Sequence, residues 1–221
     1  MTEIVAIDGP AGSGKSSVSK QVARELGFGY LDTGAAYRAL AWAVLQGDFE
    51  LANLAEVDLD ASFDYAISLD ADDFWVRVGV HDVTAAIREQ RVAEFVSQVA
   101  RIQTVRDFMK RLTHRLVAQS GRAGVVVEGR DITTVVLPDA NARLLLTASE
   151  EVRLKRRSAE IGVNDTQKVA RQVSQRDASD AAVSDFMTPA EGVILIDSSD
   201  LNFEQTVAAV LETIANATTK D

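Results

Sequence analysis

The chain has 221 residues, of which 47% are hydrophobic and 25% are charged. This composition is typical of a folded globular protein and excludes a chain that is disordered over most of its length. Acidic residues outnumber basic ones by 33 to 23, and this balance argues against a surface that binds nucleic acid. Any phosphate group that the protein binds must therefore be small and held locally.

The sequence contains no cysteine, which excludes disulfides, thiol nucleophiles and zinc sites built from cysteine. Glu3, Asp8 and Gly9 interrupt the first residues, where a signal peptide would need a basic start and an unbroken apolar run. No apolar run reaches the roughly 18 residues of a membrane span. We therefore expect a cytoplasmic protein without a membrane segment.

The first part of the chain alternates between strand and helix. The apolar run 3–8 is typical of a strand, and residues 15–26 follow with apolar side chains at helical spacing. Residues 28–32 predict a second strand, and 34–47 predict a second helix. The apolar face of this helix would carry Tyr37, Leu40, Ala41, Val44 and Leu45. Gly27 follows the first helix and Gly47 closes the second, as expected for helix C-caps.

The pattern changes near residue 62. Segments 62–69 and 73–80 both alternate between apolar and polar residues, which predicts an antiparallel hairpin. One face would carry Phe63, Tyr65, Ile67 and Leu69 together with Phe74, Val76, Val78 and Val80. Helical segments are expected at roughly 85–100 and 102–119.

Continuous apolar runs return at 124–129, 143–149 and 192–197, and they are typical of strands buried on both faces of a parallel sheet. A helix over 149–162 would start at a serine N-cap, and an amphipathic helix over 202–217 would close the chain. We therefore predict a single open α/β domain that carries an inserted antiparallel hairpin.

One stretch carries specific chemistry. Residues 9–16 read GPAGSGKS and match the phosphate-loop pattern G-x-x-x-x-G-K-[ST], between a predicted strand and a predicted helix. Its glycines let backbone N–H groups turn inward toward a phosphate, and the positive end of the helix dipole adds to them. Lys15 should reach the β- and γ-phosphates, and the Ser16 hydroxyl should bind Mg²⁺. A plain glycine turn with a solvated lysine is the alternative that this context disfavours.

The rest of the sequence narrows the class of phosphate-loop protein. A GTPase should carry D-x-x-G and N-K-x-D, and neither pattern occurs. A mechanical ATPase should end a later strand with Asp-Glu, whereas Glu128 is followed by a glycine. A small kinase remains, in which a second molecule accepts the γ-phosphoryl group.

Several segments together resemble one family. IDGPAGSGKSSVSKQVARELG, LDTGAAYR, AAIREQRVAEFVSQVA, VEGRDITTVVLPDA and DSSDL are similar to segments of bacterial cytidylate kinases, of the nucleoside monophosphate kinase superfamily. The similarity runs in order to about residue 200. It implies a P-loop kinase fold with a five-stranded parallel sheet, a monophosphate-binding insertion at about 34–120 and a helical lid at about 153–180.

The resemblance also implies the reaction. ATP would phosphorylate CMP and dCMP to CDP and dCDP with Mg²⁺. Separately, nothing in the sequence suggests an obligate interface, and we expect a monomer. The nucleophile would be a phosphate oxygen that is already ionised near neutral pH, because the second phosphate pKa is about 6. No general base is then required, and we interpret His81 and His114 as surface or structural residues.

Site residues follow from the matching positions. The resemblance implies a catalytic group of Lys15, Arg130, Arg157 and Arg176. It implies an ATP site of Gly9, Pro10, Ala11, Gly12, Ser13, Gly14, Lys15, Ser16, Ser17 and Arg153. It implies a CMP site of Asp32, Thr33, Arg38, Ser97, Arg106, Arg130, Asp131, Arg176 and Asp180.

The residues have separate roles in this scheme. Arg38, Arg130 and Arg176 would hold the CMP phosphate, Arg153 would stack on the adenine, and Arg157 would face the transferring phosphates. Asp131 would accept a hydrogen bond from the cytosine N4 amino group, the feature that distinguishes cytosine from uracil, with Ser97 and Arg106 beside it. Asp180 would contact the ribose. We interpret Arg156, on another helix face, as a solvated helix end.

Two positions depart from the family pattern. Val183 stands where the family often has an arginine, and Thr133 stands where it often has a glycine, which could alter the local backbone. Two other readings stay open. The protein could be a related kinase for UMP, AMP or another small acceptor, or a nucleotide-binding regulator that keeps the phosphate loop without turnover.

Overall fold

The computed structural model describes residues 2–161 and 187–218. The chain forms two compact units, and the second of them, Leu31–Gly121, is inserted between the two parts of the first, Met1–Tyr30 and Arg122–Asp221. The monophosphate-binding function expected of the insertion at about 34–120 stays a prediction. Each unit is described on its own below.

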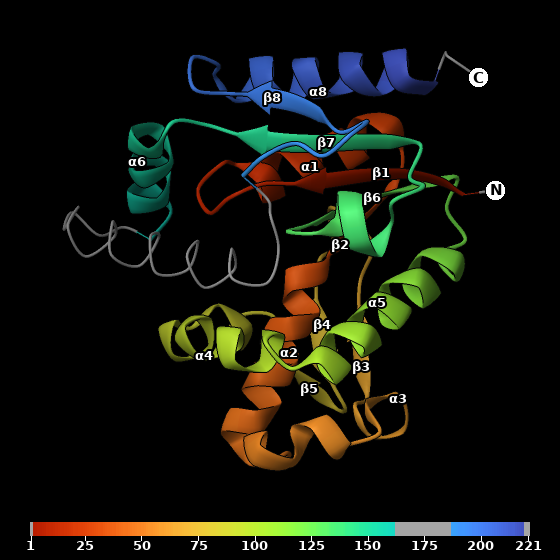
Figure 1. Cartoon of the computed structure of the whole chain (residues 1–221), viewed down its shortest axis with the longest axis vertical. Helices are drawn as coiled ribbons and strands as arrows, with labels where there is room; N and C mark the ends of the chain where they lie inside the picture. Colours follow the sequence, from red (N-terminus) through yellow and green to blue (C-terminus); the bar gives the residue numbers. More distant parts are fainter. Residues whose placement is uncertain (1, 162–186, 219–221) are drawn as a thin grey trace. The chain divides into compact units, whose positions relative to one another are not determined.

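The first unit is built on a five-stranded parallel sheet (Figure 1). The strands in chain order are β1 (Glu3–Asp8), β2 (Gly29–Asp32), β6 (Gly124–Gly129), β7 (Ala142–Thr147) and β8 (Ile194–Asp197). Their order across the sheet is β2-β6-β1-β7-β8, with β1 parallel to both β6 and β7. The predicted α/β fold class and all five predicted strands are confirmed.

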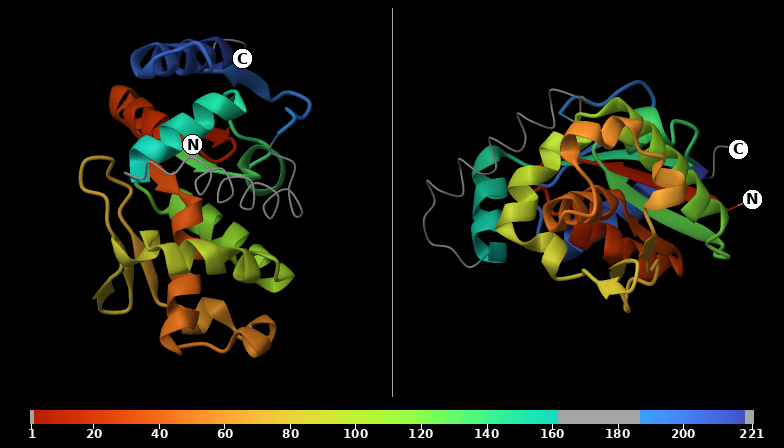
Figure 2. Two further views of the ribbon diagram at one scale, coloured as in Figure 1. Left: turned by 90° about the vertical axis from the view of Figure 1, so that its left-hand side faces the viewer. Right: turned by 90° about the horizontal axis from the view of Figure 1, so that it is seen from below.

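The apolar side chains of the central strands account for the burial of these strands. Val5, Ala6 and Ile7 of β1 and the valines of β6 are shielded from solvent on both faces of the sheet. Helices α1 (Lys15–Leu26) and α8 (Phe203–Thr218) pack against each other, α1 on β1 and β6 and α8 on β7 and β8 (Figure 2). The edge strand β8 differs, because Ile194 and Leu195 are 43% and 48% exposed.

The carboxyl ends of the parallel strands meet at one edge of this sheet. Asp8, the last residue of β1, pairs in register with Gly129, the last residue of β6. The segment that follows β1 is the phosphate loop, and the segment that follows β6 contains Arg130 and Asp131. Ligands of open α/β sheets bind at this edge, so the fold brings these two segments together where a site is expected.

The second unit is mainly helical. Its central helix α2 (Thr33–Gln46) contacts α4 (Gln90–Ala100), α5 (Gln103–Ala118) and the antiparallel sheet. A 3-10 helix (Leu51–Glu56) and the short α3 (Leu59–Ser62) pack on α5. The predicted apolar face of α2 is only partly right. Val44 and Leu45 are half-buried, whereas alanines around most of the helix are fully buried because neighbours approach it from several sides.

The predicted hairpin of the second unit is confirmed with one correction. β3 (Tyr65–Ile67) and β4 (Val76–Val78) are antiparallel, and a third short strand, β5 (His81–Asp82), pairs with β4. Val80 does not share the buried face, because it is 93% exposed. The chain turns at Gly79, which has a φ of 54°, and the alternation of the strand ends there.

Helix boundaries in the second unit also differ from the predicted ones. The segment expected as a helix from about residue 85 begins instead with a 3-10 turn (Ala86–Arg88), and α4 starts at Gln90. Glycines close α1 and α2 as predicted, since Gly27 and Gly47 adopt the left-handed conformation and cap the last carbonyls.

Candidate functional site

The phosphate loop joins the end of β1 to the start of α1, as the sequence predicts. Gly12 and Gly14 have φ angles of 76° and 85°, and the Ser13 amide donates to the Pro10 carbonyl at 3.3 Å. A side chain at Gly12 would collide with the backbone, because its Cβ would lie 2.5 Å from the Arg153 carbonyl oxygen. The loop therefore needs glycine here for both its conformation and its close packing.

Lys15 and Ser16 both contact one buried carboxylate, that of Glu128. The Lys15 ammonium lies 2.7 Å from Glu128 Oε2, and the Ser16 hydroxyl donates to Glu128 Oε1 at 2.6 Å. The Tyr30 hydroxyl donates to the same Oε1 at 3.0 Å. Both Glu128 and Tyr30 are almost completely buried, so the carboxylate is held in one orientation beside the phosphate loop.

Sequence reasoning did not include Glu128 or Tyr30 among the site residues. A signal for Glu128 was available, because it is the only charged residue in a continuous apolar strand. That strand lies beside the one that leads into the phosphate loop. Tyr30 carried no comparable signal, since a buried tyrosine on a short strand is most simply a core residue.

A second buried carboxylate, Asp8, anchors the segment after β6. It accepts hydrogen bonds from the backbone amides of Ile132 and Thr133 at 3.0 and 2.8 Å, and from the Thr133 hydroxyl at 2.7 Å. Burial raises the pKa of Asp8, and the three hydrogen bonds partly oppose this shift. Thr133, which departs from the family pattern, thus donates two of the three hydrogen bonds to Asp8. Its own backbone φ angle is negative.

Arginines surround the phosphate loop. The Arg130 guanidinium donates to the Gly9 carbonyl at 2.8 Å, and that of Arg153 donates to the Ala11 carbonyl at 3.0 Å. Arg153 is only 7% exposed, and Arg157 is half-buried on the same helix, α6 (Glu150–Ile161). The adenine, acceptor-phosphate and transfer roles of these three residues stay predictions.

The interpretation of Arg156 as a solvated helix end is wrong. Its side chain is half-buried and donates to the Ser13 carbonyl at 3.1 Å. It also donates to the hydroxyl and carbonyl oxygens of Ser198 at 3.0 and 2.9 Å, and to the Leu201 carbonyl at 3.3 Å. Charge patterning along a helix cannot reveal acceptors that come from distant loops.

In the second unit, Asp32 and Arg38 form an ion pair at the start of α2. Asp32 is the N-cap residue and accepts from the Ala35 amide at 3.0 Å, while Arg38 Nη2 lies 2.7 Å from Asp32 Oδ2. Thr33 is the first residue of the helix. The buried Tyr65 hydroxyl has no hydrogen-bond partner within the described ranges. Burial and the Asp32 carboxylate raise the Tyr65 pKa well above its usual value.

The predicted base-reading residues belong to different elements. Asp131 precedes a short π-type turn (Ile132–Val136), and its side chain does not cap that turn. Ser97 lies on α4 and Arg106 on α5, and both are half-buried. Their contribution to one base pocket stays a prediction. Arg176, Asp180 and Val183 lie outside the described residues, as does the predicted lid beyond Ile161.

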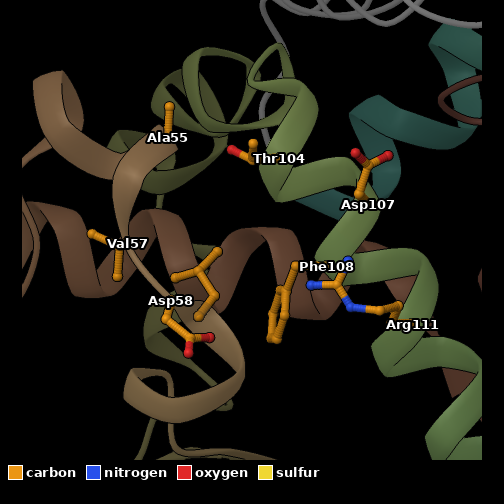
Figure 3. A pocket seen from close by; sticks show the side chains of 8 residues that line it. Ala55, Val57, Asp58, Thr104, Asp107, Phe108 and Arg111 are labelled. Atoms are coloured by element: carbon orange, nitrogen blue, oxygen red, sulfur yellow. The ribbon is translucent and has the colours of Figure 1, made fainter.

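A pocket of about 240 Å³ in the second unit does not involve the predicted site residues (Figure 3). Its lining includes Asp58, Asp107, Phe108 and Arg111. Pockets for small molecules usually measure about 300–1,000 Å³, so this one is small. Arg111 is already paired with Asp60 at 2.7 Å, and its charge is therefore compensated. The pocket is an unpromising site for a nucleotide.

Comparison with known proteins now identifies the family. The family model described as cytidylate kinase matches residues 5–216. The chain belongs to the cytidylate kinase family. It is 43% identical over 214 residues to the cytidylate kinase of Cutibacterium acnes, which covers 96% of this chain and 95% of that protein. It is 40% identical over 221 residues to that of Mycobacterium leprae, covering 97% and 96%.

Solved structures support the fold. The shikimate kinase of Bacteroides thetaiotaomicron superposes with a TM-score of 0.51 at 10% identity and covers 96% of this chain and 98% of that one. An uncharacterized protein from Eubacterium ventriosum gives 0.55 at 13% identity, covering 97% and 99%. At such low identity the likeness extends to the fold alone.

Family membership establishes the general reaction. As a cytidylate kinase family member, the protein phosphorylates nucleoside monophosphates with ATP as co-substrate, and the regulator reading is not favoured. Lys15 and Ser16 of the phosphate loop both contact the buried Glu128, and their roles in this reaction stay predictions. No helix in the part of the chain that the structure describes is long and apolar enough to span a membrane.

Proposed function

We propose that the protein transfers the γ-phosphoryl group of ATP to CMP and dCMP and forms CDP and dCDP. The observation that carries the proposal is a complete phosphate loop at the carboxyl end of the central strand, in a chain that matches the cytidylate kinase model over residues 5–216. The preference for cytosine, the site roles and the monomeric state are parts of this proposal. A cytoplasmic location stays a prediction from the sequence.

The residues around Ser16 fit Mg²⁺. Mg²⁺ prefers oxygen ligands and usually binds one or two protein groups together with phosphate oxygens and water. The Ser16 hydroxyl and the Glu128 carboxylate, 2.6 Å apart, offer such a pair at the start of α1. We propose that these two residues hold the ion, which when bound neutralises charge on the phosphates of ATP.

The chain's own groups then position two polyanions. Backbone N–H groups of the loop and the N-terminus of α1 bind the β-phosphate, and Lys15 spans the β- and γ-phosphates. The acceptor oxygen of CMP needs no general base, because the phosphate is ionised near neutral pH. Catalysis comes from alignment and charge compensation, to which Arg130 and Arg157 contribute.

Base selection rests on Asp131 in this proposal. A carboxylate accepts a hydrogen bond from the cytosine amino group, whereas uracil presents an acceptor at the same place. A site that would leave its own polar groups unpaired with the wrong base can discriminate by about 10⁴-fold. By the resemblance, Ser97 and Arg106, which belong to the second unit, are also assigned to base recognition.

An assay of ADP release with CMP, dCMP, UMP and AMP as separate acceptors tests the proposal. We expect efficient ADP release with CMP and dCMP and slow release with the other two. Fast release only with UMP or AMP would identify a related kinase. ADP or ATP binding without turnover on any acceptor would identify a regulator.

A further inference from the structure

Arginine side chains hold alternate carbonyl groups of the phosphate loop. The acceptors and donors are Gly9 with Arg130 at 2.8 Å, Ala11 with Arg153 at 3.0 Å, and Ser13 with Arg156 at 3.1 Å. All three donors are guanidinium Nη1 atoms, and charge-assisted hydrogen bonds of this kind are among the stronger ones in proteins.

Holding a carbonyl also orients the next amide. In a planar trans peptide, the C=O of one residue and the N–H of the following residue point in opposite directions, and the described chain has no cis peptide bond. An arginine on the Ala11 carbonyl therefore directs the Gly12 N–H away from that arginine. Arg156 on the Ser13 carbonyl does the same for the Gly14 N–H. These glycine amides are the groups that a phosphate cradle must present.

Arg156 directs all of its Nη donors at the protein itself. Its four hydrogen bonds to described residues take two bonds from each Nη atom, so every Nη hydrogen is directed at a protein oxygen. Its Nη groups could reach a phosphate only by breaking these bonds. Arg156 thus has the geometry of a support for the loop rather than of a ligand for the nucleotide.

The acceptors of Arg156 are themselves fixed. Ser198, just after β8, is completely buried, and its hydroxyl donates to the Thr147 carbonyl at the end of β7 at 2.9 Å. The guanidinium is planar and rigid, so it sets the distance between the Ser13 carbonyl and the turn that contains Ser198 and Leu201. The phosphate loop is in this way tied to the ends of two strands of the sheet.

We propose that Arg156 is a positioning residue for the triphosphate, acting through the Ser13–Gly14 peptide. This inference rests on the proposed function, since ATP is the ligand that the oriented amides would bind. Loss of Arg156 frees the Ser13 carbonyl to rotate toward the cradle, where it would meet phosphate oxygens with the wrong polarity. The effect falls on ATP and ADP and leaves CMP affinity unchanged.

Calorimetric titration with Mg-ADP tests the inference. We compare the wild-type protein with Arg156→Met and with the matched control Lys155→Met, which removes the same charge from an exposed neighbour on α6. We expect Arg156→Met to weaken ADP binding by about tenfold, equivalent to about 1.4 kcal/mol, and Lys155→Met to leave it unchanged. The CMP dissociation constant should stay the same in all three proteins. An Arg156→Met protein that matches Lys155→Met in ADP affinity, or that loses CMP and ADP affinity equally, would overturn the inference.

Arg156→Lys keeps the positive charge but lacks the planar fork, and it also carries the test if Arg156→Met does not fold. We expect an ADP affinity between those of the wild type and Arg156→Met, with the backbone amide resonance of Gly14 shifted before any ligand is added. Full wild-type affinity together with an unshifted Gly14 resonance would refute positioning. Absence of ADP binding by the wild-type protein would instead overturn the proposed function, and this inference with it.

Discussion

Thr133→Val removes one hydrogen bond from a buried carboxylate without a large change in side-chain shape. The Thr133 hydroxyl lies 2.7 Å from Asp8 Oδ2, and the two residues are 3% and 2% exposed, so water cannot replace the lost donor. A hydrogen bond to a charged group contributes about 1.5–3 kcal/mol. Because Asp8 keeps its hydrogen bonds from two backbone amides, we expect the free energy of unfolding to fall by about 2 kcal/mol. A loss of this size lowers the midpoint of thermal unfolding by about 4–8 °C in a domain of this size.

The loss should depend on pH in a defined direction. The pKa of Asp8 is already raised in the folded protein, mainly by burial, so the unfolded chain releases this proton first as the pH rises. The free energy of unfolding therefore decreases as the pH rises from the ordinary Asp8 pKa of 3.8 to the higher pKa of the folded protein. Removing the hydroxyl raises the folded pKa further and extends the decline. The difference between variant and wild type should be largest at about pH 7 and smallest at about pH 4.

Urea unfolding at both pH values measures this effect. Thr134→Val is the matched control, because Thr134 is the exposed neighbour in the same turn, and its substitution should change the free energy of unfolding by less than about 0.5 kcal/mol. Equal stability of Thr133→Val and the wild type at neutral pH, or a loss that grows on acidification, would refute the role assigned to Thr133.

Three further predictions concern other parts of the protein. Asp131→Ala should reduce the ratio of kcat/KM for CMP over UMP by more than tenfold, as expected from the loss of about 1–3 kcal/mol of base discrimination, with little change in the KM for ATP. Equal losses for both acceptors would contradict base reading. Tyr65→Phe removes a buried hydroxyl that has no partner among the described residues, and urea unfolding should show a gain of about 1 kcal/mol; a loss of that size would mean that the hydroxyl is satisfied. Asp60→Asn breaks exposed ion pairs with Arg111 and Arg115 and should cost no more than about 1 kcal/mol at neutral pH. The hydrogen bond from Arg111 lowers the Asp60 pKa, so this contribution is present above the ordinary value of 3.8 and should disappear as the pH falls through the lowered one. A cost that persists in stronger acid would contradict that origin.

Local patterns in the sequence were sufficient for most of the fold. Continuous apolar runs predicted the parallel strands, and glycines at 27 and 47 predicted two helix ends, because both signals arise from the residues themselves. The predictions failed where contacts with neighbouring parts of the chain determine the structure. Val80 continued an alternating pattern but lies beyond a turn at Gly79, and the buried face of α2 is wider than its periodicity predicts.

The site was predictable in part for the same reason. The phosphate loop is a contiguous motif, so its residues could be named from the sequence alone. The shared partner of Lys15 and Ser16 is Glu128, on a strand more than a hundred residues away, and the sequence does not show that Glu128 faces them. Arg156 is the clearest case, since its acceptors at Ser13 and Ser198 belong to two loops that only the folded sheet brings to one helix.

Phosphorus NMR of a mixture of the protein, Mg-ATP and CMP tests the central claim most directly, because it follows the γ-phosphoryl group itself. We predict that the resonances of CDP appear at the rate at which those of ATP disappear, and that Lys15→Ala slows both by orders of magnitude. Formation of inorganic phosphate in place of CDP, or undiminished turnover by the Lys15→Ala protein, would contradict the proposed phosphoryl transfer.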